Sequence, residues 1–191
     1  YSLTVEPTAS FWDAGEYIST AAKLQIGHPP GAPLFQMIGA FFALFAPNPE
    51  KIALMVNLMS VFSSAFTILF LFLTITLLFD KIFNFESYKT LLDKFTFFGS
   101  AAIGALALCF SDSFWFNAVE AEVYAMATLI LSILFYLALK WEKEMNTPRG
   151  DRWLLLISFV IGLSFGVHFM GLLTIPAIGM LYYFKNYKKV T

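Results

Sequence analysis

Long apolar segments separated by short polar stretches dominate the pattern of this chain. Residues 52–79 contain no formal charge. A helix over them would be about 42 Å long at about 1.5 Å per residue, enough to cross a bilayer core of roughly 30 Å with some tilt. Further apolar segments cover residues 95–111 and 123–139, and residues 153–184 hold no formal charge either. The pattern predicts an all-α fold, a polytopic membrane helical bundle.

The segment 153–184 is long for a single helix. It contains helix-weakening residues on both sides of His168, namely Gly162, Gly166, Gly171 and Pro176. These residues predict two short spans that meet at His168. Together with the three earlier segments this gives about five transmembrane helices within residues 52–191.

The first 51 residues predict a loop instead of a span. Residues 33–45 are apolar but too short to cross a bilayer comfortably, so we expect an interfacial or re-entrant helix there. Tyr1 to Val5 are typical of the exit from an earlier span, which we expect before Tyr1. Residues 1–191 are therefore interpreted as a single transmembrane domain, with residues 1–51 as its outer loop.

Composition supports the membrane assignment. Hydrophobic residues make up 59% of the chain and charged residues 13%, whereas about a quarter of a soluble domain is charged. The net charge of -1 comes without a basic patch outside the short loops, so nucleic acid is not an expected partner. Cys109 is the single cysteine, which excludes a disulfide within the chain.

The cations predict the orientation. Ten of the 12 lysines and arginines fall into three segments, which the positive-inside rule places in the cytoplasm. These residues are Lys81, Lys89 and Lys94, then Lys140, Lys143, Arg149 and Arg152, and finally Lys185, Lys188 and Lys189. The first loop, the 112–122 loop and His168 are then expected on the outer side.

Two carboxylates begin the predicted helix at about residues 13–25. Asp13 and Glu16 are three residues apart and would face the same volume. One could accept a proton from a hydroxyl while the other tunes its pKa. The structural alternative is that both acids favour the helix dipole. Gly15 between them favours a functional interpretation, because glycine costs a helix about 1 kcal/mol and permits close approach of a backbone or ligand.

The ends of this helix also have sequence signals. Ser10 and Asp13 fit a capping box with Ser10 as the N-cap, and Asp13 and Glu16 fit the same pattern one register later. Gly27 is expected to stop the helix before His28-Pro29-Pro30-Gly31. That stretch is interpreted either as a rigid turn or as a binding segment whose imidazole contacts a phosphate or acceptor.

A second acidic segment covers residues 115–124, W-F-N-A-V-E-A-E-V-Y. Its aromatic residues are typical of the membrane interface. Glu120 and Glu122 stand at the mouth of a span, where carboxylates are costly unless they have a role. They are two residues apart and would point in different directions on a helix, so we expect one, with a slight preference for Glu120, to face the site. Asp112 is interpreted as an ordinary residue at the end of a span.

His168 has two interpretations, as a helix-packing residue or as a second phosphate ligand. The sequence contains no H-x-x-x-H pattern and no paired cysteines, so no metal ligand is assigned. It also lacks a phosphate-binding glycine-rich loop and a nucleophilic serine elbow. Nucleotide hydrolysis therefore has no support.

Three segments carry a family resemblance: E-P-T-A-S-F-W-D-A-G-E, H-P-P-G-A-P-L-F and W-F-N-A-V-E-A-E-V-Y-A. They resemble a domain of unknown function in Bacteroidetes membrane proteins that is related to the animal protein O-mannosyltransferases. That family belongs to the GT-C superfamily of multi-span glycosyltransferases, which use polyprenyl- or dolichyl-phosphate sugars. The D-x-G-E and H-P-P-G pair is the specific part of the resemblance.

The resemblance implies a GT-C-type fold with its active site in the first outer loop. Asp13 would be the general base that deprotonates a Ser or Thr hydroxyl, with inversion at the sugar carbon, and Glu16 would support it. His28 would shape the donor or acceptor pocket, and Glu120 or Glu122 would supply a second acidic contact.

The partners implied by the resemblance are a polyprenyl-phosphate-linked sugar, mannose in the first instance, an exported protein acceptor and the lipid bilayer. No cofactor besides the donor is implied. The location would be a bacterial inner membrane with the active site on the periplasmic side. One departure is that a donor phosphate favours Arg or Lys, whereas the outer face offers Lys23, Lys51 and the two histidines.

Other functions stay open on the sequence. A GT-C transferase could modify a lipid or a glycan instead of a protein. A transporter is disfavoured, because Asp, Glu, Lys and Arg are absent from the middle of the predicted spans. A non-enzymatic membrane scaffold would use both acidic segments as plain caps. The sugar, the acceptor, a requirement for a divalent metal and the oligomeric state are not decided.

Overall fold

The computed structural model describes residues 1–83 and 90–187, and in this part of the chain all regular structure is helical. Two short helices come first, α1 (Ala14–Lys23) and α2 (Pro33–Ala43), followed by a 3-10 turn η1 (Pro49–Lys51). The long helices are α3 (Ile52–Phe83), α4 (Leu91–Cys109) and α6 (Val123–Glu144), with the short α5 (Asp112–Ala118) between the last two. The chain ends with α7 (Gly150–Ser164), η3 (Phe169–Leu173) and α8 (Thr174–Asn186). The all-α bundle is as predicted.

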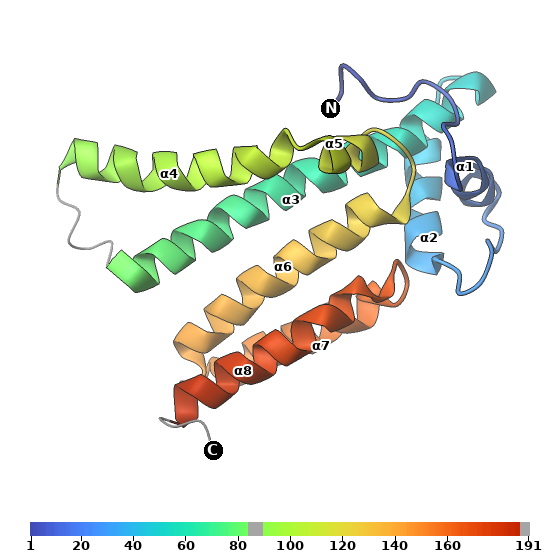
Figure 1. Cartoon of the computed structure of the whole chain (residues 1–191). Coiled ribbons are helices and arrows are strands. Elements are labelled where there is room, and N and C mark those ends of the chain that lie inside the picture. Colours follow the sequence, from blue (N-terminus) through green and yellow to red (C-terminus); the bar gives the residue numbers. More distant parts are fainter. Residues whose placement is uncertain (84–89, 188–191) are drawn as a thin grey trace.

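The long helices lie side by side, α7 and α8 run along α6, and α1, α2 and α5 gather at one end (Figure 1). α3 packs most extensively against α6, and α4 runs back along α3. α1 and α2 lie where α3 starts and α6 begins, whereas the described C-terminus lies at the opposite end. The first loop therefore belongs to the end of the bundle that α1 and α2 occupy.

Three of the helices, α3, α4 and α6, are long and apolar enough to cross a membrane, within the described residues. α2 is apolar but has 11 residues, in keeping with the expected interfacial or re-entrant segment. α7 and α8 have 15 and 13 residues, or about 22 and 20 Å of helix. Two short helices meeting at His168 are confirmed, because His168 is the N-cap of η3 between them. The count of five spans stays a prediction.

The core lies between α1, α2, α3, α6 and α7. The largest fully buried apolar side chains are Phe35, Met59, Leu134, Ile157 and Val56. On α3 the buried face also carries hydroxyls that bond within their own helix: Ser63 donates to the Met59 carbonyl at 2.8 Å and Thr67 to the Ser63 carbonyl at 2.9 Å. Small side chains whose hydroxyls are hydrogen-bonded within their own helix let helix backbones approach closely in an apolar environment.

Several predicted boundaries are wrong. The polar stretch expected between the apolar segments 52–79 and 95–111 is partly helical, since α3 continues to Phe83 and α4 begins at Leu91. The 112–122 segment is likewise helical over Asp112–Ala118. α3 and α4 include charged residues within their helical turns, which a boundary placed at the first charge misses. Lys89, Lys188 and Lys189 lie outside the described residues.

The predicted capping box at α1 is also absent. Asp13 is the N-cap and makes no side-chain capping bond. Ser10 does not cap the helix, because its hydroxyl donates to Glu120 at 2.6 Å. A complete capping box occurs instead at α4, between Thr90 and Asp93. At its other end α1 stops at Leu24, whose φ of 50° is left-handed, three residues before the predicted stop at Gly27.

Candidate active site

The first loop is fixed to the bundle by backbone contacts. Asn57, fully buried on α3, donates to the carbonyls of Glu6 at 2.7 Å and Thr8 at 2.9 Å. The Glu6 amide donates to the Val119 carbonyl at 3.0 Å. These bonds place the segment before α1 directly against the second acidic segment. Sequence reasoning missed Asn57, although an amide in an otherwise apolar helix is a signal for such a role.

Asp13, Glu16 and His28 converge at the start of α1, and we refer to them as the outer cluster. Each offers one ligand-type atom, and these atoms lie within 4.8 Å of one another. The expectation that the two carboxylates face one volume is thus met in the structure. The Asp13 side chain has no hydrogen bond among the described residues, so its oxygens stay available.

Glu16 and His28 form a pair. The His28 amide donates to Glu16 Oε1 at 2.6 Å, and His28 Nδ1 lies 3.1 Å from Glu16 Oε2. The backbone hydrogen bond and then the side-chain contact with His28 lower the pKa of Glu16. The turn is closed by the Gly31 amide, which donates to the His28 carbonyl at 2.8 Å while Gly31 takes a φ of 79°. The turn thus orients the histidine toward α1.

The close approach of another backbone expected at Gly15 is absent. A Cβ placed there would meet Ala9 Cβ at 3.8 Å, an ordinary van der Waals distance. No backbone approaches closely enough to require glycine. The functional interpretation of Asp13 and Glu16 therefore rests on their convergence with His28.

Glu120 and Glu122 are both buried, with 3% and 4% of their surface exposed. They lie in the link between α5 and α6, not on a helix, so the helical geometry behind the expectation that one of them faces the site does not apply. Glu120 accepts the Ser10 hydroxyl at 2.6 Å. Burial raises the pKa of Glu120, and the bond from Ser10 partly opposes that rise.

Glu122 is the acidic side chain of the site whose pKa lies nearest neutrality. Burial raises its pKa to about 7, and the charges of Asp13 and Glu120 add to the effect. Backbone N–H groups of Asp13 and Val123 hydrogen-bond to it and act in the opposite direction. Its Oε1 atom has no hydrogen-bond partner. Glu122 therefore lies beside Asp13 with an unsatisfied oxygen.

Tyr17 completes the site, and the sequence analysis missed it. Burial raises the pKa of its hydroxyl to about 12, with further contributions from the charges of Glu122, Asp13 and Glu16. The pKa of the hydroxyl is thus affected by three carboxylates, which come from two segments far apart in the sequence. Its ring packs edge-on against Phe35 at 5.1 Å between centroids. A tyrosine one residue after Glu16 gave no separate signal in the sequence.

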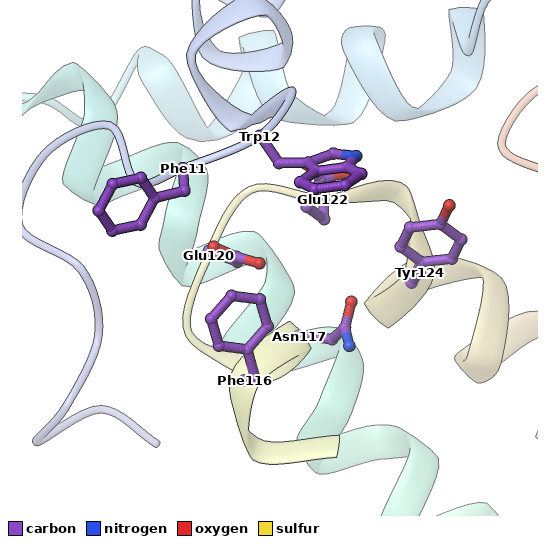
Figure 2. Close-up of a pocket in the computed structure, with 7 residues that line it drawn as sticks. All are labelled: Phe11, Trp12, Phe116, Asn117, Glu120, Glu122 and Tyr124. Atoms are coloured by element: carbon purple, nitrogen blue, oxygen red, sulfur yellow. The ribbon is translucent and has the colours of Figure 1, made fainter. Parts of the chain in front are cut away.

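An open pocket of about 270 Å³ adjoins the outer cluster. Figure 2 shows the residues that line it, which come from the first loop, from α5, from the α5–α6 link and from the start of α6: Phe11, Trp12, Phe116, Asn117, Glu120, Glu122 and Tyr124. Trp12 is 88% exposed and has a φ of 62°, a backbone conformation that bulky residues rarely adopt. Glu122 lines the pocket and also lies beside Asp13, so it connects the pocket to the outer cluster.

His168 lies outside the outer cluster. Its Nδ1 accepts a hydrogen bond from the Met170 amide at 3.3 Å, and its ring is 5.5 Å from that of Tyr124. Through Tyr124 it borders the pocket without lining it. The contacts are those of a residue that caps η3 and packs helices.

The basic segments meet at the opposite end of the bundle. Glu142 accepts from Lys81 at 3.1 Å and from Lys185 at 3.5 Å, and Lys143 lies 3.8 Å from Asp80. We refer to these five residues as the basic end. The acidic segments and the basic end are thus separated by the length of α3 and α6 (Figure 1).

Fold and site define a class, a polytopic α-helical membrane protein with a cluster of carboxylates at one end of the bundle. Residues 13–191 match the family model described as the protein O-mannosyl-transferase TMEM260 N-terminal domain. The chain belongs to this family. The matched region begins at Asp13, the first residue of the outer cluster.

Curated relatives agree with the family match. The chain is 27% identical over 154 residues to the protein O-mannosyl-transferase tmem260 of Dictyostelium discoideum, covering 80% of this chain and 17% of the relative. It is 27% identical over 167 residues to the protein O-mannosyl-transferase TMEM260 of Mus musculus, covering 86% of this chain and 21% of the relative. The chain thus spans about a fifth of these relatives. No solved structure matches it.

Proposed function

We propose that this chain carries the catalytic loop of a membrane glycosyltransferase that moves mannose from a polyprenyl-phosphate donor to Ser or Thr hydroxyls of exported proteins. The observation that carries the proposal is the convergence of Asp13, Glu16 and His28 within 4.8 Å. Membership of a family whose described members are protein O-mannosyl-transferases supports the reaction class.

Asp13 is the proposed general base. Its carboxylate makes no hydrogen bond in the described part of the chain, whereas both oxygens of Glu16 are engaged by His28. The acceptor hydroxyl oxygen forms a bond to the anomeric carbon and gives its proton to Asp13. The bond from that carbon to the phosphate oxygen breaks, and its electron pair leaves with the polyprenyl phosphate. Attack opposite the leaving group inverts the anomeric configuration.

Glu16 and His28 lie beside the base as a mutually bonded pair, and the neighbouring pocket provides room for a sugar. Glu120 and Glu122 line that pocket together with Trp12 and Tyr124. Carboxylates accept hydrogen bonds from sugar hydroxyls, and an aromatic face packs against the apolar face of a pyranose ring. We assign Glu120 and Glu122 to substrate binding on this basis.

The site faces the outer side of the membrane in this proposal, the periplasm if the protein resides in a bacterial inner membrane. The support is that the lysines of the basic end lie opposite the outer cluster, and lysine-rich segments favour the cytoplasm. A lipid phosphate at the interface and an exported acceptor would then meet at α1.

The test supplies the purified protein in lipid with labelled polyprenyl-phosphate mannose and three acceptors. These are an exported Ser/Thr-rich polypeptide, the same polypeptide with alanine at every Ser and Thr, and a lipid-linked glycan. We expect label only on the first polypeptide, with an inverted anomeric linkage by NMR. Label on the glycan alone would replace the protein acceptor, and no transfer to any acceptor would contradict the proposal. A reaction with nucleotide-linked mannose in place of the lipid donor would overturn the donor assignment.

A further inference from the structure

The acidic end of the bundle has an uncompensated charge. In the part of the chain that the structure describes, the ion pairs that involve lysine are those of the basic end. The carboxylates of the site are Asp13, Glu16, Glu120 and Glu122. Among the described residues, one ion pair involves these four carboxylates, between Glu16 and His28, and Lys23 and Lys51 at the same end make none. A phosphate-bearing donor would be repelled by this end of the protein unless another positive charge joined it.

The outer cluster has the donor atoms and spacing of a cation site. Glu16 Oε2 and His28 Nδ1 are 3.1 Å apart, close to the roughly 3 Å edge of an octahedron with bonds of about 2.1 Å. An Asp13 oxygen lies within 4.8 Å of both residues' ligand atoms. The side chains of Glu16 and His28 are 39% and 43% exposed, so an ion can enter from solvent. These ligands come from positions that no short metal-binding motif connects.

Glu122 supplies an independent observation. It is 4% exposed, and its Oε1 atom has no hydrogen-bond partner. The charge and the backbone N–H of Asp13 both act on the pKa of its carboxylate, which places Glu122 near the outer cluster. A buried carboxylate oxygen without a partner costs free energy, and a nearby cation would remove that cost directly or through a bound water.

We propose that Asp13, Glu16 and His28, with Glu122 behind them, bind a divalent cation. A set of carboxylates with one imidazole suits Mn²⁺, since carboxylates favour Mg²⁺ and Mn²⁺ while imidazole favours the transition metals. The use of the ion rests on the proposed function: it would compensate the carboxylates and bind a phosphate oxygen of the donor. One Asp13 oxygen would hold the ion, and the other would accept the proton.

The test measures Mn²⁺ binding alone, without donor or acceptor. The purified protein is stripped with chelator and titrated with Mn²⁺, and the loss of the free-ion EPR signal gives occupancy. Wild type is compared with Asp13→Asn and Glu16→Gln, and with Glu50→Gln as a matched control. Glu50 is an exposed carboxylate on η1. Asp13→Asn removes no hydrogen bond, so we expect it to fold even where another variant does not.

We expect one tight Mn²⁺ site per chain in wild type and in Glu50→Gln, weakened about 10- to 100-fold in the two cluster variants. Wild type that binds Mn²⁺ no more tightly than folded Asp13→Asn would overturn the cation site, as would a weakening of the same size in Glu50→Gln. Because no transfer is measured, the result is separable from the proposed function. Binding by an inactive protein supports the site, and chelator-resistant transfer without bound Mn²⁺ overturns it while leaving the transferase intact.

Discussion

Glu122 and Glu16 show how similar side chains acquire opposite properties at one site. Glu16 is partly exposed and accepts two hydrogen bonds from His28, which lower its pKa. Glu122 is buried next to Asp13, and its pKa is raised to about 7. Stabilisation by ionised Glu16 is thus present at neutral pH and lost as pH falls through its lowered pKa. Glu122 has the opposite effect on stability: the protonated side chain stabilises the fold, and this contribution is lost as pH rises toward about 7.

The first prediction concerns Glu122. Between its ordinary pKa of 4.5 and about 7 the folded protein keeps a proton on Glu122 that the unfolded protein loses. The free energy of unfolding should therefore fall as pH rises through this range, by at most on the order of 3 kcal/mol. In Glu122→Gln this slope should disappear, so the variant should gain stability relative to wild type at pH 8 but not at pH 4.

Melting temperatures in detergent with chelator present, between pH 4 and pH 8, check this prediction. Glu50→Gln is the control, since Glu50 is exposed. The groups that act on Glu122 are Asp13, Glu120 and the two backbone amides. Parallel pH curves for wild type and Glu122→Gln would show that Glu122 is ionised normally, contrary to the account.

At the scale of elements, much of the fold was predictable and its local ends were not. The apolar runs predicted α3, α4 and α6, and the glycines around His168 predicted the break between α7 and α8. The Ser10 capping box failed because the hydroxyl bonds to Glu120, 110 residues away. A local pattern cannot anticipate a partner that the tertiary fold brings near.

The second prediction compares two helical glycines. Gly15→Ala should stabilise the protein by up to about 1 kcal/mol, because alanine favours helix and the added methyl group has room. Gly39→Ala should destabilise it by about 1–3 kcal/mol through overpacking, since the new Cβ would lie 2.9 Å from Ala21 Cβ. Thermal unfolding measures both, and transfer activity should be kept in Gly15→Ala. Destabilisation by Gly15→Ala would restore the close-approach role that the sequence suggested.

At the scale of the whole molecule, the separation of charge was the most predictable property. Periodicity and charge counts indicated which segments share an end, and the ion pairs of the basic end agree. The composition of the site was less predictable. Asp13, Glu16 and His28 were candidates because they are close in sequence, whereas Tyr17, Asn57 and the burial of both Glu120 and Glu122 depend on packing between distant segments.

The third prediction concerns orientation. With Cys109 replaced by Ser, a cysteine at Glu50 should react with a membrane-impermeant maleimide added outside the cell, and one at Arg149 should react only after the membrane is opened. Both positions are exposed, so reactivity reports the side of the membrane and not burial. External labelling of Arg149→Cys with protection of Glu50→Cys would reverse the orientation and place the outer cluster in the cytoplasm.

The central claim is that Asp13 accepts the proton in sugar transfer. The most direct measurement is the turnover rate of Asp13→Asn in the transfer assay, beside Asp112→Asn, an exposed carboxylate at the start of α5. The account predicts a loss of about 10²- to 10⁴-fold for Asp13→Asn, with an unchanged melting temperature, and near wild-type turnover for Asp112→Asn. Full turnover by folded Asp13→Asn would contradict it.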